Sequence, residues 1–349
     1  MRIAASPAFK LRHYNPYTWL LYKNMPVQVD EFSWFDLRSK YDILHLHWPE
    51  SDINASNNPL IAFARTRWKL FVIDYLKTRG TKLIWTVHNL KSHESLHPRL
   101  EHWLWRQFIP RVDGIISLTS TALHAVLSEH QALESIPSFI IPHGHYRDEY
   151  PNDENLNARE ILGIKHDQKI LLFFGSIRPY KGVAKLITAF REVSGEDLLL
   201  YIVGQIPTKE KEAEYLSLAA GDARVHLHLK PTFIPKNKVQ IYFQAADLVV
   251  LPYQEILNSG TALLALSYNR PILVPDQGSM GELASHVGNT WVRTYSGDIT
   301  GSILQDALNW ALTLSRTKLA PLHNFDWPKI SLETLKAYEA VLNKSGFSS

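Results

Sequence analysis

Short apolar runs alternate with amphipathic segments along most of this chain. In the first half, four apolar runs have the length of buried strands, at residues 41–48, 82–88, 114–119 and 139–142. Between them, the apolar residues of 59–78 and 97–111 return at helical spacing. Strands that alternate with helices predict parallel sheets with helical crossovers.

The same alternation resumes after a polar segment. Strands are predicted at 169–174, 198–203, 225–229, 248–251 and 272–274, and helices at 181–193, 209–219, 236–245, 261–268 and 330–342. We therefore expect an α/β protein with two doubly wound, Rossmann-like domains that face each other across a cleft. The predicted domains are 1–148 and 161–329, with 149–160 as the linker and a C-terminal helix, 330–345, that packs back on the first domain.

One turn in the second half has the chemistry of an anion site. Gly175, Ser176, Arg178 and Lys181 follow a buried strand and precede a helix. A glycine-containing turn lets backbone N–H groups approach a phosphate, and the helix N-terminus adds a positive dipole. Arginine can hold two phosphate oxygens at once, and lysine adds a mobile point charge. The turn therefore predicts a phosphorylated ligand.

A second polar segment follows another predicted strand of the same half. It contains Tyr253, Asn258, Ser259, Gly260 and Thr261, and it opens a helix. Its N–H groups and hydroxyls can form a second phosphate cradle. For an isolated Ser-Gly-Thr, simple helix capping by the serine is the commoner role. Beside the first turn, we favour ligand binding.

Polar side chains also gather at the strand ends of the first half. They are His45, His47 and Glu50 at one strand, His88, Asn89, His93 and Glu94 at the next, and His143 and His145 near the linker. A single strand histidine is usually structural, but three such strand ends on one rim favour a functional role. Metal ligation is a further interpretation, yet the spacings match no tight metal motif, and we expect no metal.

Composition excludes several classes of protein. The 349 residues carry a formal net charge of +3 and no cysteine. Disulfides and thiolate metal sites are therefore absent, and the charge is too small for a dedicated nucleic-acid binder. The sequence shows neither a signal peptide nor an uncharged run of the roughly 18 residues that a membrane span needs. We expect a soluble or peripheral protein of the cytoplasm.

Taken together, these motifs resemble glycosyltransferases of the two-Rossmann (GT-B) architecture. The turn at 175–182 is similar to the phosphate-binding turn of glycosyltransferase family 4. The combination of Asn15-Pro16-Tyr17 with the segments 44–50, 88–94, 143–148, 258–267 and 326–328 resembles family 94, whose members move mannose from GDP-mannose to a glycolipid in xanthan assembly. The matches spread over nearly the whole chain.

The resemblance implies an inverting transfer of mannose from GDP-mannose onto a lipid-linked oligosaccharide in exopolysaccharide assembly. Many family 4 enzymes carry two glutamates eight positions apart, whereas here Glu255 is followed by Leu263. Inversion needs a general base, for which Glu94, His88, Glu50 and His47 are candidates. The remaining rim residues would line the acceptor side: Asn15, His45, Asn89, His93, His143 and His145. The two cations would stabilise the departing diphosphate without a metal or a tightly bound cofactor.

Two predicted helices bear on the acceptor. Residues 59–78 and 97–111 mix apolar, aromatic and basic side chains, which suits an anionic membrane surface. An ordinary crossover helix is the commoner role for either one alone. The resemblance favours peripheral binding at the inner face of the cell membrane. The alternatives are a retaining family 4-like enzyme that uses a UDP-sugar, a non-catalytic nucleotide-sugar-binding protein and, most remotely, a nucleic-acid binder.

Overall fold

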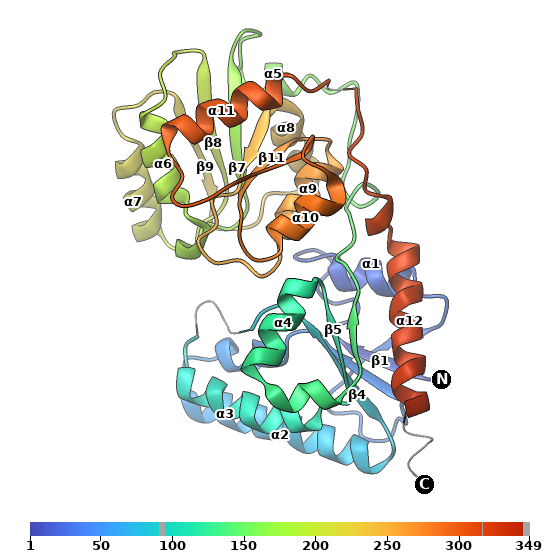
Figure 1. Cartoon of the computed structure of the whole chain (residues 1–349). Helices are drawn as coiled ribbons and strands as arrows, with labels where there is room; N and C mark the ends of the chain where they lie inside the picture. The colour runs from blue at the N-terminus through green and yellow to red at the C-terminus, as the bar shows by residue number, and fades with distance from the viewer. Residues whose placement is uncertain (91–94, 316, 345–349) are drawn as a thin grey trace. The chain divides into compact units, whose positions relative to one another are not determined.

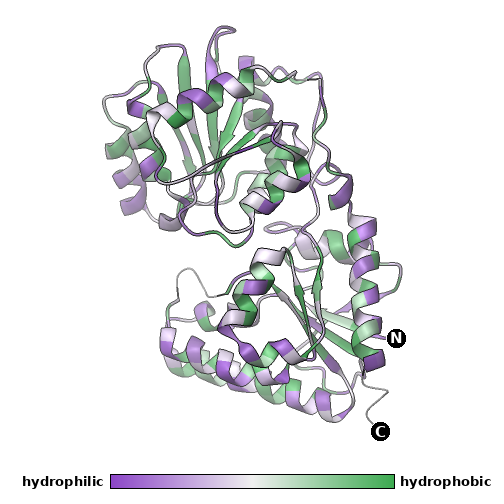
Figure 2. Cartoon of the chain, viewed as in Figure 1, coloured by the Kyte–Doolittle hydropathy of each residue, from purple (hydrophilic) through white to green (hydrophobic). Residues whose placement is uncertain are grey.

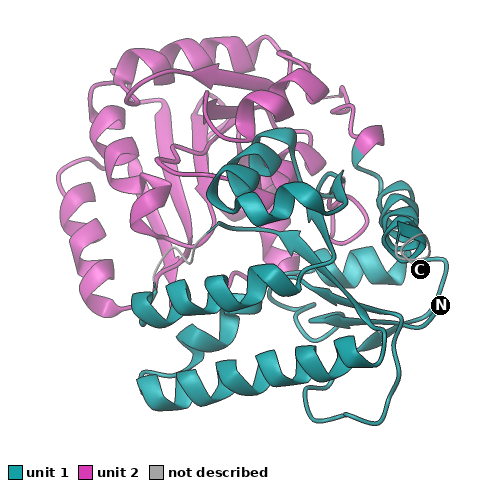
Figure 3. Cartoon of the chain, turned by 60° about the horizontal axis from the view of Figure 1, so that its bottom comes forward, with its two compact units in different colours: residues 1–144, 325–349 teal, residues 145–324 magenta. Residues whose placement is uncertain are grey.

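The computed structural model describes residues 1–90, 95–315 and 317–344. The chain divides into two compact units (Figure 3). Unit 1 contains Met1–Gly144 and Phe325–Ser349, and unit 2 contains His145–Asn324. The chain therefore passes between the units at 144/145 and 324/325, whereas the sequence predicted domain ends at 148 and 329.

Unit 1 is built on one parallel sheet of six strands. Its strands are β1 (Ile3–Ser6), β2 (Val29–Glu31), β3 (Ile43–Leu46), β4 (Lys82–Val87), β5 (Gly114–Ser117) and β6 (Ser138–Ile140). Their order is β2-β1-β3-β4-β5-β6, with Ala5 paired to His45 and His45 paired to Ile84. Every neighbouring pair is parallel, so all the carboxyl ends lie along one edge of the sheet.

Helices complete unit 1 (Figure 1). They are α1 (Tyr17–Lys23), α2 (Pro59–Thr78), α3 (Pro98–Phe108), α4 (Ser120–Glu129) and α12 (Trp327–Lys344), with 3₁₀ turns at Pro49–Ala55, Ile109–Arg111 and Gln131–Ser135. The side chain of Asn58 caps α2 by accepting a hydrogen bond from the N–H of Leu60 at 2.9 Å. Helix α12 contacts α1 and β4, so this helix belongs to the core of unit 1.

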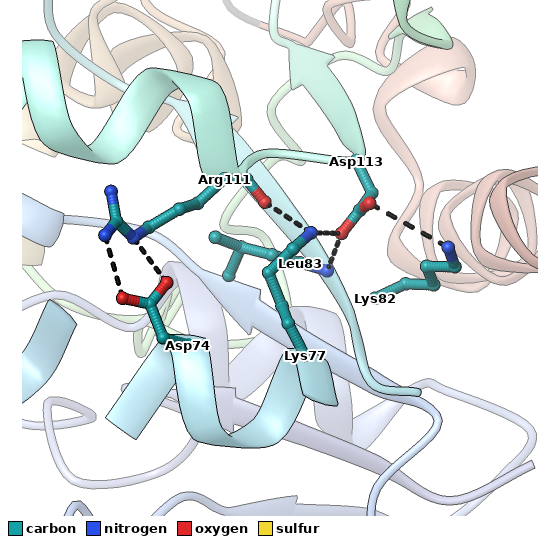
Figure 4. Close-up of polar contacts among 6 residues, drawn as sticks. All are labelled: Asp74, Lys77, Lys82, Leu83, Arg111 and Asp113. Carbon is teal, nitrogen blue, oxygen red and sulfur yellow. Dashed lines mark hydrogen bonds and ion pairs between the residues drawn. The ribbon is translucent and has the colours of Figure 1, made fainter. Parts of the chain in front are cut away.

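An ionic cluster holds α2 against the amino ends of β4 and β5 (Figure 4). The Lys77 ammonium lies 2.5 Å from a carboxylate oxygen of Asp113, and that oxygen also accepts the N–H of Leu83 at 2.8 Å. Nearby, Arg111 holds Asp74 with two hydrogen bonds of 2.7 and 2.8 Å. These contacts fix the helix at the sheet edge opposite the strand ends that carry the histidines.

Unit 2 repeats the architecture with a second parallel sheet. Its strands are β7 (Lys169–Phe174), β8 (Leu198–Gln205), β9 (Val225–Lys230), β10 (Leu248–Val250), β11 (Ile272–Pro275) and β12 (Val292–Tyr295). Their order is β12-β11-β10-β7-β8-β9. In both units the central strands are apolar and buried, as Figure 2 shows by the hydropathy of their residues. Strands buried on both faces read as continuous apolar runs, which is why these strands were visible in the sequence.

The helices of unit 2 connect these strands. They are α5 (Ala158–Ile161), α6 (Val183–Arg191), α7 (Lys209–Ala219), α8 (Lys236–Ala245), α9 (Gly260–Ser267), α10 (Met280–Val287) and α11 (Gly301–Leu312), with a 3₁₀ turn at Pro179–Lys181 and another at His323–Phe325, where unit 2 ends. The bounds predicted for α2, α7 and α8 match the structure. The final helix begins at Trp327, three residues before its predicted start.

The segment 149–160 is attached to unit 2. The Lys236 ammonium of α8 forms an ion pair with Glu149, and the Gln244 amide donates to Asn152 at 2.8 Å. Farther along, the Asn157 side chain caps α5. Side-chain contacts therefore tie the predicted linker to α8.

Candidate functional site

In unit 2, three backbone segments meet at the turn after β7. Gly175 has a φ of 134° and Gly182 a φ of 68°, conformations that favour glycine. A Cβ atom built at Gly175 would lie 3.3 Å from the Lys181 ammonium and 3.5 Å from the Thr261 hydroxyl. Lys181 and Thr261 therefore border the same space beside the turn, although they come from different segments.

Close backbone packing holds this turn in place. A Cβ atom at Gly204, on β8, would overlap the carbonyl oxygen of Gly175. A Cβ atom at Gly182 would overlap the carbonyl oxygen of Pro252, two residues after β10. Glycine at these positions lets the ends of three adjacent strands approach one another.

Lys181 is the most perturbed cation of unit 2. Burial, together with the nearby Arg178 charge, lowers the pKa of Lys181 to about 8. Its ammonium lies 5.9 Å from the centre of the Tyr253 ring, and among the described residues no carboxylate forms an ion pair with it. A phosphate in this space would favour the charged form and raise the pKa of the lysine.

The second predicted cradle lies at the N-terminus of α9. The Ser259 hydroxyl oxygen caps the helix by accepting the N–H of Ala262 at 3.1 Å, and it also contacts the Tyr253 hydroxyl at 3.1 Å. The capping role is thus the one that this side chain performs. The N–H groups of Gly260 and Thr261 stand in the first turn, where helical acceptors are lacking. Asn258 and Ser176 are half-buried beside these elements.

In unit 1, a tyrosine joins the two histidines at the end of β3, and one of these contacts the histidine after β4. The Tyr22 hydroxyl, on α1, lies 2.8 Å from Nδ1 of His45 and 2.6 Å from Nε2 of His47. Nδ1 of His47 lies 3.1 Å from Nε2 of His88. At the far end, Nδ1 of His45 also contacts the Tyr338 hydroxyl at 2.6 Å. Desolvation lowers the pKa of all three imidazoles, which are therefore neutral near pH 7.

Aromatic rings surround His88 and His143. The ring of Tyr17 lies 4.8 Å from each of these two imidazoles, and Trp48 stacks on His88 at 4.3 Å. Trp327, the first residue of α12, lies 5.4 Å from Tyr17. A Cβ atom at Gly144 would overlap the Trp327 indole, so glycine is needed there for the indole to pack. The structure thus brings His47, His88 and His143 to one rim of unit 1.

The other predicted residues lie apart from these rings or outside the described residues. Glu50 is buried in a 3₁₀ turn, where burial and the nearby Glu101 charge raise its pKa to about 7. The Asn15 side chain accepts the N–H of Tyr17 at 3.1 Å and so orders the start of α1. Asn89 is half-buried. His145 is the first residue of unit 2, and His93 and Glu94 lie outside the described residues.

The sequence did not reveal several aromatic residues that contact these histidines. Tyr17 and Trp327 belong to motifs that carried the family resemblance, which is the one signal that pointed to them. Tyr22 and Tyr338 had no such signal, because their contacts join segments far apart in the chain.

Within the described residues, no group of three or more His, Asp or Glu side chains could hold a metal ion. Over the same residues, no helix combines the length and the apolarity needed to cross a membrane.

Comparisons with known proteins fit this geometry. Residues 154–302 match the family "Glycosyl transferases group 1". A curated relative from Xanthomonas campestris, named GDP-mannose:glycolipid 4-beta-D-mannosyltransferase, is 32% identical over 95% of this chain and 90% of its own length.

Solved structures share the fold. WaaG, a glycosyltransferase involved in lipopolysaccharide biosynthesis, aligns with a TM-score of 0.59 at 18% identity, over 98% of this chain and 96% of its own. Anabaena Alr3699/HepE in complex with UDP-glucose aligns with a TM-score of 0.57 at 15% identity, over 88% of this chain and 79% of its own. The two parallel sheets are those of the GT-B fold.

Proposed function

This chain belongs to the group 1 glycosyltransferases, and we propose that it moves mannose from GDP-mannose onto a lipid-linked oligosaccharide with inversion at the anomeric carbon. It is a nucleotide-sugar-dependent enzyme with the GT-B fold. The observation that carries the finer proposal is the match to the Xanthomonas mannosyltransferase, which extends over nearly the full length of both chains. A mannose that is α-linked in the donor and β-linked in the product requires inversion.

Unit 2 supplies the donor site in this proposal. The diphosphate lies beside Gly175, where Lys181 and Thr261 border one space and Arg178 adds a second cation. As the bond between the anomeric carbon and the phosphate oxygen breaks, negative charge develops on the diphosphate. Preorganised cations and N–H groups stabilise that charge. Two cations can do so without a metal ion.

Unit 1 supplies the general base. A base must be unprotonated at working pH, and the lowered pKa of His88 satisfies this requirement. His88 also belongs to a chain of buried hydrogen bonds, which restrains its ring. Glu50, whose pKa is raised to about 7, is the second candidate by protonation state, but burial keeps it from solvent. Glu94 stays a prediction from the sequence.

The test is a transfer assay with GDP-, UDP- and ADP-sugars and a lipid-linked acceptor, followed by NMR of the product's anomeric carbon. We expect transfer from GDP-mannose, a β-linked product and full activity in the presence of EDTA. An α-linked product would identify the retaining alternative. If the protein neither transfers nor hydrolyses any of these sugars, the non-catalytic alternative, a nucleotide-sugar-binding protein, would remain.

We also propose that α2 binds this enzyme to the anionic inner surface of the cell membrane. One face of the helix exposes an apolar stripe at helical spacing, made of Leu60, Ala64, Trp68, Phe71 and Tyr75. Phe35, 84% exposed, stacks on Trp68 with ring centres 6.2 Å apart. A stripe of this kind is unusual on a protein surface that faces only water.

Charge complementarity supports an anionic bilayer as the partner of this stripe. Arg65 and Arg67 are exposed on α2, on either side of the apolar residues. A helix with aromatic and leucine residues flanked by arginine suits the interface of an anionic bilayer. A lipid-linked acceptor places the substrate at the same surface.

A further inference from the structure

The Tyr22 hydroxyl occupies a branch point in the buried histidine network. It contacts Nδ1 of His45 on one side and Nε2 of His47 on the other, at 2.8 and 2.6 Å. His47 then contacts His88 through its other nitrogen, at 3.1 Å. Tyr22 comes from α1, whereas the histidines come from β3 and from the residues directly after β3 and β4. The tyrosine is therefore coupled to His88 through one imidazole.

Burial decides how many protons this network holds. His45 is 0% exposed, His47 1% and Tyr22 4%, so charged forms are disfavoured. A neutral imidazole has one N–H donor and one bare nitrogen that accepts. Each hydrogen bond along the chain must therefore pair one donor with one acceptor, and the choice at one bond dictates the choice at the next.

Two proton patterns satisfy the bonds that join Tyr22 to His45 and His47, and His47 to His88. In the first, the Tyr22 hydroxyl donates to Nε2 of His47, the Nδ1–H of His47 donates to Nε2 of His88, and the hydrogen of His88 is on Nδ1. In the second, the Tyr22 hydroxyl donates to Nδ1 of His45 and accepts the Nε2–H of His47. His88 then donates its Nε2–H to Nδ1 of His47 and keeps a lone pair on Nδ1. The direction of a single tyrosine hydrogen thus determines whether Nδ1 of His88 is a donor or an acceptor.

We propose that Tyr22 is a positioning residue that sets the tautomer of His88 through His47, and that the second pattern is the reactive one. This inference rests on the proposed function. In the reaction, the acceptor O–H bond breaks and its proton moves to Nδ1 of His88. The acceptor oxygen bonds the anomeric carbon, and the electron pair of the breaking carbon–oxygen bond leaves with the diphosphate. The imidazolium formed on His88 keeps its Nε2–H bond to His47, which stabilises the charge.

The kinetic test uses Tyr22→Phe, which keeps the ring and removes the hydroxyl. We expect kcat to fall on the order of 10²-fold, the lower end of what general base catalysis contributes, with an unchanged KM for the donor. The matched control is Tyr41→Phe, since Tyr41 is another buried tyrosine of unit 1 and packs on Phe32. In a His47→Asn background, Tyr22→Phe should have no further effect. Additive losses would overturn a role that acts through His47.

The second readout is ¹⁵N NMR of the histidine rings in the full chain, which reports which nitrogen carries the proton. In the wild type, Nδ1 of His47 and Nε2 of His88 must differ in protonation, and Tyr22→Phe must change the pattern. If both of these nitrogens are protonated in the wild type, or if both are bare, the coupling is overturned. This outcome does not depend on whether the variant folds. Wild-type kcat in a variant with a changed pattern would overturn the catalytic role. A wild type that transfers no sugar would instead refute the proposed function and leave the NMR result standing.

Discussion

Gly204 on β8 packs so closely on Gly175 that a side chain at Gly204 would overlap the Gly175 carbonyl oxygen. Gly175 begins the turn that borders Lys181 and Thr261, and its N–H donates to the Val203 carbonyl at 3.0 Å. The conformation of the proposed phosphate turn is thus set by the neighbouring strand as well as by its own sequence.

Replacement of Gly204 by alanine should therefore displace the turn. We expect Gly204→Ala to destabilise unit 2 by about 1–3 kcal/mol, as overpacking does, and to weaken nucleotide binding. Urea unfolding and isothermal titration with GDP measure the two effects. Gly281→Ala on α10 is the control, because its Cβ would meet only the end of the Asp276 side chain, at 3.0 Å. Wild-type stability and affinity in Gly204→Ala would contradict this packing argument.

Lys181 should bind the donor through its charge. We expect Lys181→Met to weaken binding of GDP by roughly 10-fold or more, since a charge-assisted hydrogen bond contributes about 1.5–3 kcal/mol. Removal of the buried charge should leave the melting temperature unchanged or higher. The control is Lys185→Met, which affects an exposed lysine of α6 that pairs with Asp298. Equal GDP affinities in the two variants would argue against a phosphate beside Gly175.

Glu50 should make the stability of unit 1 depend on pH. The pKa of Glu50 is raised from 4.5 to about 7 because the folded protein favours the protonated form. Its contribution to the free energy of unfolding is therefore fully present below pH 4.5 and is lost as the pH rises through 7. Above pH 7 the buried charge costs up to about 3 kcal/mol. We expect Glu50→Gln to stabilise the protein at pH 8 and to have little effect at pH 5, by urea unfolding. The exposed Glu134→Gln serves as control. A gain of the same size at both pH values would exclude this cause.

The buried imidazoles should have the opposite effect. Burial lowers the pKa of His143 to about 4 and that of His45 to about 3. Their contribution is present above the ordinary value near 6.5 and is lost as the pH falls toward those lowered values. Each histidine should lower the free energy of unfolding by about 1.4 kcal/mol for each unit by which the pH falls in this range. We expect that His143→Asn makes the free energy of unfolding depend less steeply on pH between pH 6.5 and 4.5. The decrease in slope should correspond to the uptake of one proton. An unchanged slope would mean that His143 does not titrate this way.

The apolar stripe of α2 should govern membrane binding. We expect Leu60→Ser/Phe71→Ser to reduce flotation with vesicles that contain phosphatidylglycerol, while transfer to a water-soluble acceptor analogue persists. The control is Leu216→Ser on α7, a leucine of unit 2 that is 55% exposed. Vesicles of neutral lipid should bind the wild type less well, because Arg65 and Arg67 lose their partners. Equal flotation of the double variant and the control would contradict this assignment.

Local pattern alone determined much of the fold. The apolar run of β7 and the helical spacing of α2 appear in the sequence at the bounds that the structure shows. Several elements were not predicted, including the short strands β1 and β2, with four and three residues, and the whole of α10 and α11. A three-residue strand owes its existence to its neighbours in the sheet, so its own residues carry little signal.

The sequence by itself also determined which polar residues stand in the proposed phosphate turn, because a turn between a strand and a helix is a local feature. Only the tertiary structure decided which side chains meet in unit 1. Tyr338 contacts His45 across 293 positions of the chain, and Tyr22 reaches His45 and His47 from a helix that the sequence did not reveal. Such contacts depend on how a helix packs on the sheet, and residue order does not encode that packing in any local pattern. The sequence placed these histidines only at the ends of strands. The packing of helices on the sheet joins them into one hydrogen-bonded network in the folded protein.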